Sequence, residues 1–507
     1  MRWIFNIATN YLRFAVSMVV VFLMTPYIID TLGMDMFGLW SLIFALIGIF
    51  GLMDFGFATA AVKTVAEATG SNDEAGRNRA LASLLMVYTI IGLISLVLVM
   101  LLSGVAAERF DLSDSQHQVF LPVIWLLGIA VSLNFPASLF KAALSGAGRM
   151  HVVNAVELIM VLINAALVYS LLQAGYGITG LAISTTLTML GTSLALIPLA
   201  YRLLPGFSLS WRLISLRNIR PLLSFSGYAF LANLAVLVAL RLDPVIIKLF
   251  LPLSAVALYA VAAKISEYTF LLNKQFSNAL MPLVSQLHGR GDDVAIRRIM
   301  LDGTRFLLAL AVPAIGLLYY YAPEFIHLWL GAEFAESASL LRILLLALIP
   351  VTLQLNAANI LGMTGQHRFL ALGMLASAVL NLVLSMGLIA TYGIQGAALG
   401  TLAAVVLVEA GLILPRACRH SRVSATTFFA NVVWPPLPAL LPMLAGAWAL
   451  DHWMATDSLG LLFFKVMLCV MTYLAAFTFT GMSASERGQL AQTLRLRQAP
   501  AVSMGAE

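Results

Sequence analysis

Apolar segments of about twenty residues, separated by short segments that are polar or rich in glycine and proline, follow one another along the 507-residue chain. A helix of about twenty apolar residues crosses the hydrocarbon core of a bilayer, which is about 30 Å thick. The pattern therefore predicts an all-α polytopic membrane protein with about fourteen transmembrane helices. The expected helices cover residues 11–30, 37–62, 80–104, 118–140, 152–173, 178–201, 221–242, 254–285, 301–322, 337–361, 369–391, 396–415, 428–450 and 458–481.

The composition agrees with this pattern. Hydrophobic residues make up 61% of the chain and charged residues only 10%, whereas soluble domains contain about 25% charged residues. Fourteen helices of roughly 22 residues each leave only short connections between them. Such connections cannot form a folded domain outside the membrane, which excludes soluble enzymes, nucleic-acid-binding proteins and receptors with large external domains.

The basic residues are distributed unequally between the two sides of the membrane. With the N-terminus placed in the cytoplasm, 20 of the 29 lysine and arginine residues fall in cytoplasmic segments, and Arg109 alone falls in an outer loop. Cytoplasmic loops of membrane proteins carry such an excess of basic residues. We therefore predict that both termini are cytoplasmic. Residues 1–10 lack the basic region and the cleavage site of a signal peptide, so we expect a retained anchor.

The two halves of the sequence resemble each other at a displacement of 216 to 219 residues. Tyr-Gly-Ile-Thr-Gly at 176–180 recurs as Tyr-Gly-Ile-Gln-Gly at 392–396, and Pro-x-Ile-Ile at 26–29 recurs at 244–247. Because six helices fit into this displacement, both halves would have the same orientation, as in transporters with parallel repeats. The predicted organisation is an N-terminal six-helix lobe (1–201), a basic cytoplasmic linker (202–220), a second six-helix lobe (221–415), two additional helices (428–481) and a cytoplasmic tail (482–507).

Two N-terminal segments carry a resemblance to a known family. Residues 26–41 read Pro-Tyr-Ile-Ile-x-x-Leu-Gly-x-x-x-Phe-Gly-Leu-Trp-Ser, and residues 51–56 read Gly-Leu-x-Asp-Phe-Gly. Together with Asp-x-x-Ile-Ile at 243–247 and the two Tyr-Gly-Ile-x-Gly turns, they resemble bacterial polysaccharide transporters of the multidrug/oligosaccharidyl-lipid/polysaccharide exporter superfamily. The resemblance implies a V-shaped fold of two helical lobes in the bacterial inner membrane.

The same resemblance implies a flippase for surface polysaccharide synthesis, such as that of O-antigen, capsule or exopolysaccharide. Its substrate would be an oligosaccharide unit linked to undecaprenyl pyrophosphate, which moves from the cytoplasmic to the outer leaflet. Candidate partners beside this lipid-linked glycan and the bilayer are a polysaccharide polymerase and a chain-length regulator.

Charged side chains within the predicted helices are candidates for the transport path, because each costs roughly 2.5–3.5 kcal/mol to insert. Lysine and arginine bind phosphate oxygens, so basic residues in the membrane could form a cationic cavity for a pyrophosphate. The alternative is that they extend to the interface or form ion pairs within a lobe. The candidate substrate-binding residues are Arg241, Lys264, Lys274, Lys248, Arg13 and Arg305.

Three acidic residues are candidates for ion coupling or gating: Asp54, Glu267 and Asp243. A carboxylate inside the membrane can carry a proton, bind Na⁺ or pair with a cation. Spacing places Glu267 on the same helix face as Lys264, and Asp54 could instead cap a broken helix. Apart from an H⁺ or Na⁺ coupling ion we expect no cofactor or metal, because the seven histidines and two cysteines lack metal-ligand spacing.

Other function classes fit the sequence less well. A membrane-embedded polysaccharide enzyme needs a convergent set of nucleophiles, acids or metal ligands, and an ATP-driven pump needs a P-loop; the sequence shows neither. Within the superfamily, a multidrug/cation antiporter would favour an acidic cavity, whereas the excess charge in the predicted helices is basic. A flippase for a lipid-linked peptidoglycan precursor has the same expected topology and stays an alternative.

Overall fold

The computed structural model describes residues 2–214, 234 and 241–489, and these residues form helices and no strands. The chain divides into two compact units. Unit 1 consists of Met1–Lys264 and Arg368–Ala404, and unit 2 consists of Ile265–His367 and Val405–Glu507. The predicted lobes, 1–201 and 221–415, stay a prediction, because most of the connection between them lies outside the described residues.

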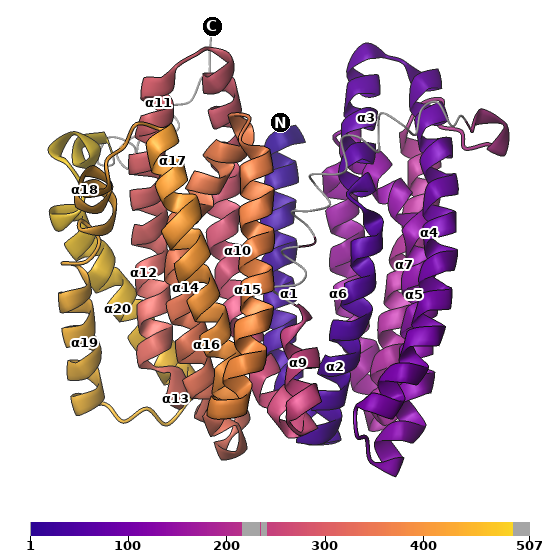
Figure 1. Ribbon diagram of the computed structural model, residues 1–507, viewed down its shortest axis with the longest axis horizontal. Coiled ribbons are helices and arrows are strands. Elements are labelled where there is room, and N and C mark those ends of the chain that lie inside the picture. Colours follow the sequence, from indigo (N-terminus) through magenta and orange to yellow (C-terminus); the bar gives the residue numbers. More distant parts are fainter. Residues whose placement is uncertain (1, 215–233, 235–240, 490–507) are drawn as a thin grey trace, which may run out of the picture. The chain divides into compact units, whose positions relative to one another are not determined.

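Unit 1 is organised around α5, which packs against α3, α4 and α7 (Figure 1). Its core includes Phe57, Leu84, Tyr88, Leu139 and Leu196, all of which are buried. The α-helices of this unit are α1 (Arg2–Leu32), α2 (Met34–Phe50), α3 (Phe57–Ser71), α4 (Glu74–Arg109), α5 (Asp114–Gly146), α6 (Met150–Gln173), α7 (Gly177–Leu203), α9 (Asp243–Phe250), the first part of α10 (Leu253–Gly289), α15 (His367–Tyr392) and α16 (Ile394–Ala404). Two short 3₁₀ turns, η1 (Gly51–Asp54) and η2 (Trp211–Leu213), complete it.

Unit 2 is organised around α14, which contacts α12, α13, α17 and the π-helix η5. The helices α19 and α20 pack on each other and on α12. Besides the remainder of α10, the unit contains α11 (Asp293–Arg298), η3 (Ile299–Gly303), α12 (Thr304–Tyr320), α13 (Ala322–Leu330), η4 (Ala332–Phe334), α14 (Ala335–Met363), η5 (Val405–Ile413), α17 (Leu414–His420), α18 (Ala425–Phe428), η6 (Phe429–Val433), α19 (Leu440–Trp453) and α20 (Leu459–Thr480).

The polytopic α-helical fold class is confirmed. Among the described residues, 11 helical segments are long and apolar enough to cross a membrane, and each matches one of the fourteen expected helices. The expected helix at 221–242 lies almost entirely outside the described residues. The two other differences, at 37–62 and 428–450, have local causes in the sequence.

The expected helix at 37–62 is interrupted after α2. Gly51–Asp54 form a 3₁₀ turn, and Phe55 and Gly56 then adopt φ values of 48° and 77° before α3 begins. A glycine reaches this left-handed region without a steric penalty. The expected helix at 428–450 is interrupted where the sequence reads Trp-Pro-Pro-Leu-Pro at 434–438, because proline provides no backbone N–H for a helical hydrogen bond.

Candidate functional site

Polar side chains on the first half of α1 face the beginning of α6. The amide of Asn6 donates a hydrogen bond of 3.2 Å to the carbonyl oxygen of Gly148, in the turn between α5 and α6. One turn further on, Asn154 donates to the hydroxyl of Thr9 at 3.2 Å. These contacts place the start of α1 beside the α5–α6 turn and fix which face of α1 meets α6.

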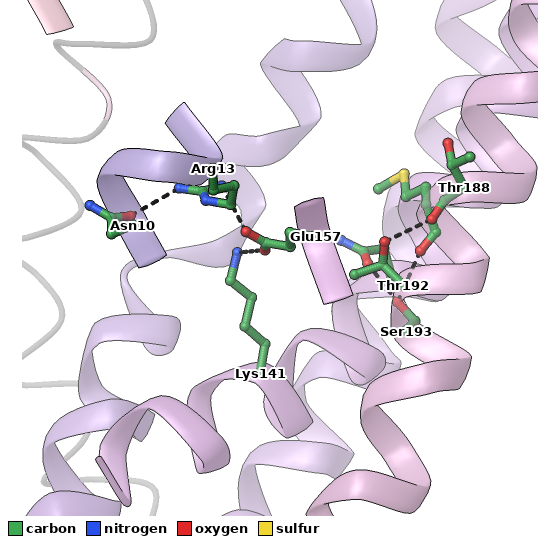
Figure 2. A network of polar contacts seen from close by, with 9 residues as sticks. Asn10, Arg13, Lys141, Glu157, Thr188, Thr192 and Ser193 are labelled. Carbon is green, nitrogen blue, oxygen red and sulfur yellow. Dashed lines mark hydrogen bonds and ion pairs between the residues drawn. The ribbon is translucent and has the colours of Figure 1, made fainter. Parts of the chain in front are cut away.

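A charged network continues this polar seam toward the interior of unit 1. Figure 2 shows Glu157 of α6 between Arg13 of α1 and Lys141 of α5. Glu157 Oε2 lies 2.7 Å from Arg13 Nη1, Glu157 Oε1 pairs with Lys141 Nζ, and Arg13 Nη2 donates to Asn10 Oδ1 at 3.2 Å. Glu157 is the most enclosed of the three ionic side chains, with 16% exposure against 32% for Arg13 and 50% for Lys141. Two cations around one carboxylate leave one positive charge in excess.

A second polar group in Figure 2 belongs to α7 and is uncharged. Thr192 donates to the carbonyl oxygen of Thr188 at 2.8 Å, and Ser193 donates to the side-chain oxygen of Asn134 at 3.0 Å. These bonds satisfy polar groups inside a helix bundle, as expected for helix packing in a membrane. We assign this group a packing role.

Arg241, a predicted substrate ligand, rests against α2. Its guanidinium lies 5.4 Å from the ring centroid of Phe44. One turn later, Gly48 leaves the space into which the Arg241 side chain packs, because a Cβ at Gly48 would lie 3.2 Å from Arg241 Cδ. No carboxylate among the described residues forms an ion pair with Arg241. Phe44 and Gly48 therefore orient the guanidinium of Arg241, and its positive charge stays available to bind an anion.

We expect Gly48→Ala to lower the flipping rate several-fold while the protein keeps its melting temperature. A methyl group at 3.2 Å from Arg241 Cδ requires the flexible arginine, rather than the backbone, to move by a few tenths of an ångström. Gly104→Ala on α4 is the matched control, because a Cβ there meets nothing within 4 Å. Flipping by proteoliposomes that contain each variant measures the effect, and equal rates for both variants would contradict the positioning role of Gly48.

Lys274, another predicted ligand, lies half-buried on α10 in unit 2. Its ammonium lies 5.6 Å from the ring centroid of Phe270, one turn earlier on the same helix. As with Arg241, no carboxylate of the described residues pairs with it. A cation that costs energy to insert and lacks a counter-ion requires an explanation other than internal ion pairing.

The other predicted basic ligands have different surroundings. Lys264 lies half-buried on α10, the helix that also carries Glu267. Lys248, at the end of α9, is half-buried and donates to the carbonyl oxygen of Asp111 at 3.3 Å. Arg305, only 12% exposed, pairs with Glu486 and lies 3.3 Å from Asp302. The two carboxylates give Arg305 a structural explanation, and we leave it out of the proposed site.

Glu486 follows α20 and lies outside the candidate membrane spans. Burial alone would raise the pKa of this carboxyl, but hydrogen bonds from Ser483 and the nearby Arg305 guanidinium outweigh burial and hold the pKa below its usual value. The carboxylate therefore stays charged at neutral pH and compensates Arg305.

Of the three predicted acidic residues, Glu267 is half-buried on α10, and the other two are a helix cap and a buried carboxylate. Asp54 accepts hydrogen bonds from the backbone N–H of Ala58 at 3.3 Å and from the Tyr88 hydroxyl at 2.5 Å, contacts that fit a cap of α3. Asp243, at the start of α9, is 4% exposed and accepts a hydrogen bond from the Tyr259 hydroxyl through Oδ2. Its other oxygen, Oδ1, is buried without a hydrogen-bond partner. Asp243 is thus the better candidate for a group that takes up an ion.

Three residues of the site have no clear signal in the sequence. Lys141 lies near the end of α5, beside a predicted cytoplasmic loop, and the partners of Glu157 are 144 and 16 residues away in sequence. The glycine at position 48 has no sequence signal that distinguishes it from the many other helical glycines. Only the tertiary structure places Lys141 beside Glu157 and Gly48 beside Arg241.

Comparison with known proteins defines the family. The family described as polysaccharide biosynthesis proteins matches residues 31–339, which is more than half of the chain. The chain belongs to this family. The match covers α2–α7, both candidate ligands Arg241 and Lys274, and the coupling candidate Asp243. The expected relationship to polysaccharide transporters is confirmed.

Curated relatives and solved structures agree with this assignment. The chain is 26% identical to "Uncharacterized membrane protein EpsK" of Bacillus subtilis (68% of each chain covered) and 24% identical to "Probable flippase AglR" of Haloferax volcanii (76% of this chain, 77% of that one). Among solved structures, the lipid II flippase MurJ in an inward closed conformation is similar with a TM-score of 0.73, at 13% identity, over 94% of this chain and 98% of that chain. At this identity the similarity to MurJ establishes the fold alone.

Proposed function

We propose that this member of the polysaccharide biosynthesis family is a flippase for lipid-linked oligosaccharides. Its substrate would be an oligosaccharide unit attached to undecaprenyl pyrophosphate, moved from the cytoplasmic to the outer leaflet of the bacterial inner membrane. Both termini would lie in the cytoplasm, as the distribution of basic residues predicts. Relatives named as flippases support the proposal.

The observation that carries the proposal is a cation without an ion pair in each of the two units. Arg241 lies just before α9 in unit 1 and Lys274 lies on α10 in unit 2, and neither forms an ion pair within the described residues. Guanidinium and ammonium groups that keep their full charge bind phosphate oxygens strongly in a site with little water. A pyrophosphate would supply the missing negative charge to the cation that it reaches, and aromatic contacts with Phe44 and Phe270 hold the two cations before it binds.

The membrane potential would favour the proposed direction. Moving one charge through about 100 mV is worth about 2.3 kcal/mol, so exporting a dianion from a negative interior gains about 5 kcal/mol per 100 mV. Alternating access of two lobes would expose the cations first to one leaflet and then to the other. The polyprenyl chain would stay in the lipid while the sugars and the pyrophosphate cross in the protein.

We place ion coupling at Asp243. A buried carboxylate with one unsatisfied oxygen, Oδ1, favours its protonated form or a bound cation over the bare charge. Tyr259 would hold the other oxygen in both states. The ion could be H⁺ or Na⁺.

We expect Asp243→Asn to abolish the stimulation of flipping by an inward proton or sodium gradient while flipping without a gradient persists. The amide keeps the shape of the side chain but carries no charge to be titrated. Asp54→Asn is the control, since the Asp54 side chain already accepts hydrogen bonds from α3 and Tyr88. Undiminished gradient stimulation in the Asp243 variant would contradict the coupling assignment.

The proposed function is tested in sealed proteoliposomes that contain the purified chain and an undecaprenyl-pyrophosphate oligosaccharide. A sugar-modifying enzyme added outside detects the glycan that reaches the outer leaflet. We expect exposure that depends on time and on the protein, beyond that in protein-free liposomes. Export of a small organic cation without glycan exposure would instead favour a multidrug/cation antiporter, and exposure of only a lipid-linked peptidoglycan precursor would favour that alternative substrate.

A further inference from the structure

The charged network of unit 1 contains more positive charge than an internal ion pair requires. Glu157 is bound through one oxygen to Arg13 and through the other to Lys141 (Figure 2). A single cation would neutralise this carboxylate. The second cation adds a net charge inside a membrane protein, where uncompensated charges are costly and mark functional sites.

The position of the network fits a group that crosses the membrane. Glu157 lies about 10 Å from the start of α6, at a rise of about 1.5 Å per residue, and α6 is apolar and long enough to span a membrane. The carboxylate therefore lies between the middle of the helix and the end where α1 begins. In the expected topology this is the cytoplasmic half of the membrane.

The chemistry of the network matches that of a phosphate. Arginine and lysine are the usual ligands of phosphate oxygens, and a carboxylate offers the same negative oxygens in a similar geometry. Arg13 and Lys141 are also more exposed than Glu157, so an incoming anion can reach both cations from the side that Glu157 does not cover.

We infer that Arg13 and Lys141 form a phosphate-binding station in unit 1, and that Glu157 occupies this station until the pyrophosphate of the substrate displaces it. This inference rests on the proposed function. Exchange between two anions keeps both cations in contact with an anion before, during and after the passage of the substrate. It also weakens substrate binding, which transport requires for release. Glu157 thereby sets the affinity of the protein for its substrate and the rate of flipping.

Binding of farnesyl diphosphate, a short polyprenyl diphosphate, to the full-length protein in nanodiscs tests this inference by calorimetry. We expect E157Q to lower the Kd about tenfold, because the competing anion is gone, and to slow flipping in proteoliposomes. The further change K141Q in the E157Q protein should reverse most of the gain. The matched control is E67Q, which removes one carboxylate from the exposed Lys63–Glu67 pair on α3 (3.8 Å) and should leave the Kd unchanged.

A purely structural ion pair makes the opposite prediction. If Glu157 only joined α1, α5 and α6, E157Q would lower the melting temperature and would leave the Kd unchanged or raise it, which would overturn the inference. E157D covers the case in which E157Q does not fold: its shorter side chain keeps the charge but cannot reach both cations, so the Kd should still fall. An unchanged Kd for E157D would equally overturn the inference.

The flipping assay separates this inference from the proposed function. Glycan flipping in proteoliposomes that is lost in K274Q supports the flippase proposal whatever the Glu157 variants do. Absence of farnesyl diphosphate binding to a wild-type protein that still flips the glycan would overturn the inference alone.

Discussion

Replacing Arg241 or Lys274 by glutamine is expected to lower the rate of glycan flipping at least tenfold, and replacing both about a hundredfold. Each substitution removes a cation that no carboxylate of the described chain neutralises. We therefore expect it to weaken substrate binding and to leave the stability of the fold unchanged. Charge-assisted hydrogen bonds to an anion contribute about 1.5–3 kcal/mol each, which corresponds to one to two factors of ten in rate. The proteoliposome assay measures these rates at equal protein content.

Arg342→Gln is the matched control for this prediction. The Arg342 guanidinium lies 5.3 Å from the ring centroid of Tyr319, nearly the distance between Arg241 and Phe44, but it donates to the carbonyl oxygen of Tyr319 at 2.9 Å near the start of α14. Its loss should therefore leave flipping within about twofold of wild type, because its guanidinium is already bound to backbone carbonyl oxygens. Equal rates for the Arg241, Lys274 and Arg342 variants would contradict this prediction, because all three positions have a cation–aromatic contact and the available charge would then not distinguish the first two.

The second large effect is expected for stability. Lys465 on α20 is fully buried, and its ammonium donates to Asp451 Oδ1 at 2.8 Å, to the carbonyl oxygen of Met454 at 2.5 Å and to Thr456 Oγ1 at 2.7 Å. All three donors of the ammonium are thus satisfied. Lys465→Met should lower the free energy of unfolding by about 3–5 kcal/mol, because Asp451 then keeps the hydrogen bonds from Tyr320 and Tyr321 but loses its counter-charge.

Thermal unfolding of the purified protein, followed by loss of monodisperse material, measures this effect. Asp451→Asn in the Lys465→Met protein should recover part of the loss, since it removes the orphaned charge. Lys63→Met, which breaks an exposed pair at 3.8 Å, should cost less than about 1 kcal/mol. Equal melting temperatures for the Lys465 and Lys63 variants would contradict the assignment of a buried structural centre between α19 and α20.

The helical architecture follows from the sequence because a membrane allows few alternatives. Without water in the bilayer core, each backbone N–H and carbonyl group must find its partner inside a helix or a closed barrel, so an apolar segment of sufficient length becomes a helix. Local composition also marks the interruptions, at the glycines around Asp54 and at the prolines at 434–438. The prediction that each hydrophobic segment forms one continuous helix is wrong at 37–62 and at 428–450.

The candidate site was only partly predictable. Sequence marks Arg241, Lys274 and Arg305 equally, as charges in apolar surroundings. Whether such a charge has a partner depends on contacts across the chain: Glu486 reaches Arg305 from 181 residues away, whereas Arg241 lies against the ring of Phe44 and the space at Gly48. Lys465 shows the same limit, since its three acceptors come from the end of α19 and the loop that follows it, and the sequence does not predict the path of this loop. A charged residue in an apolar segment predicts a role in function or in stability. The tertiary contacts then distinguish candidates for transport from residues that stabilise the fold.

We propose that Arg241 and Lys274 bind the pyrophosphate of a lipid-linked glycan during transport. The most direct test of this proposal is the flipping rate of one oligosaccharide attached to the same polyprenyl chain through a diphosphate, a monophosphate or an uncharged linkage. We expect the wild-type flipping rate to fall in that order, and the preference for diphosphate to disappear when Arg241 and Lys274 are both replaced by glutamine. Equal rates for the three lipids, or a preference that survives the double replacement, would contradict it.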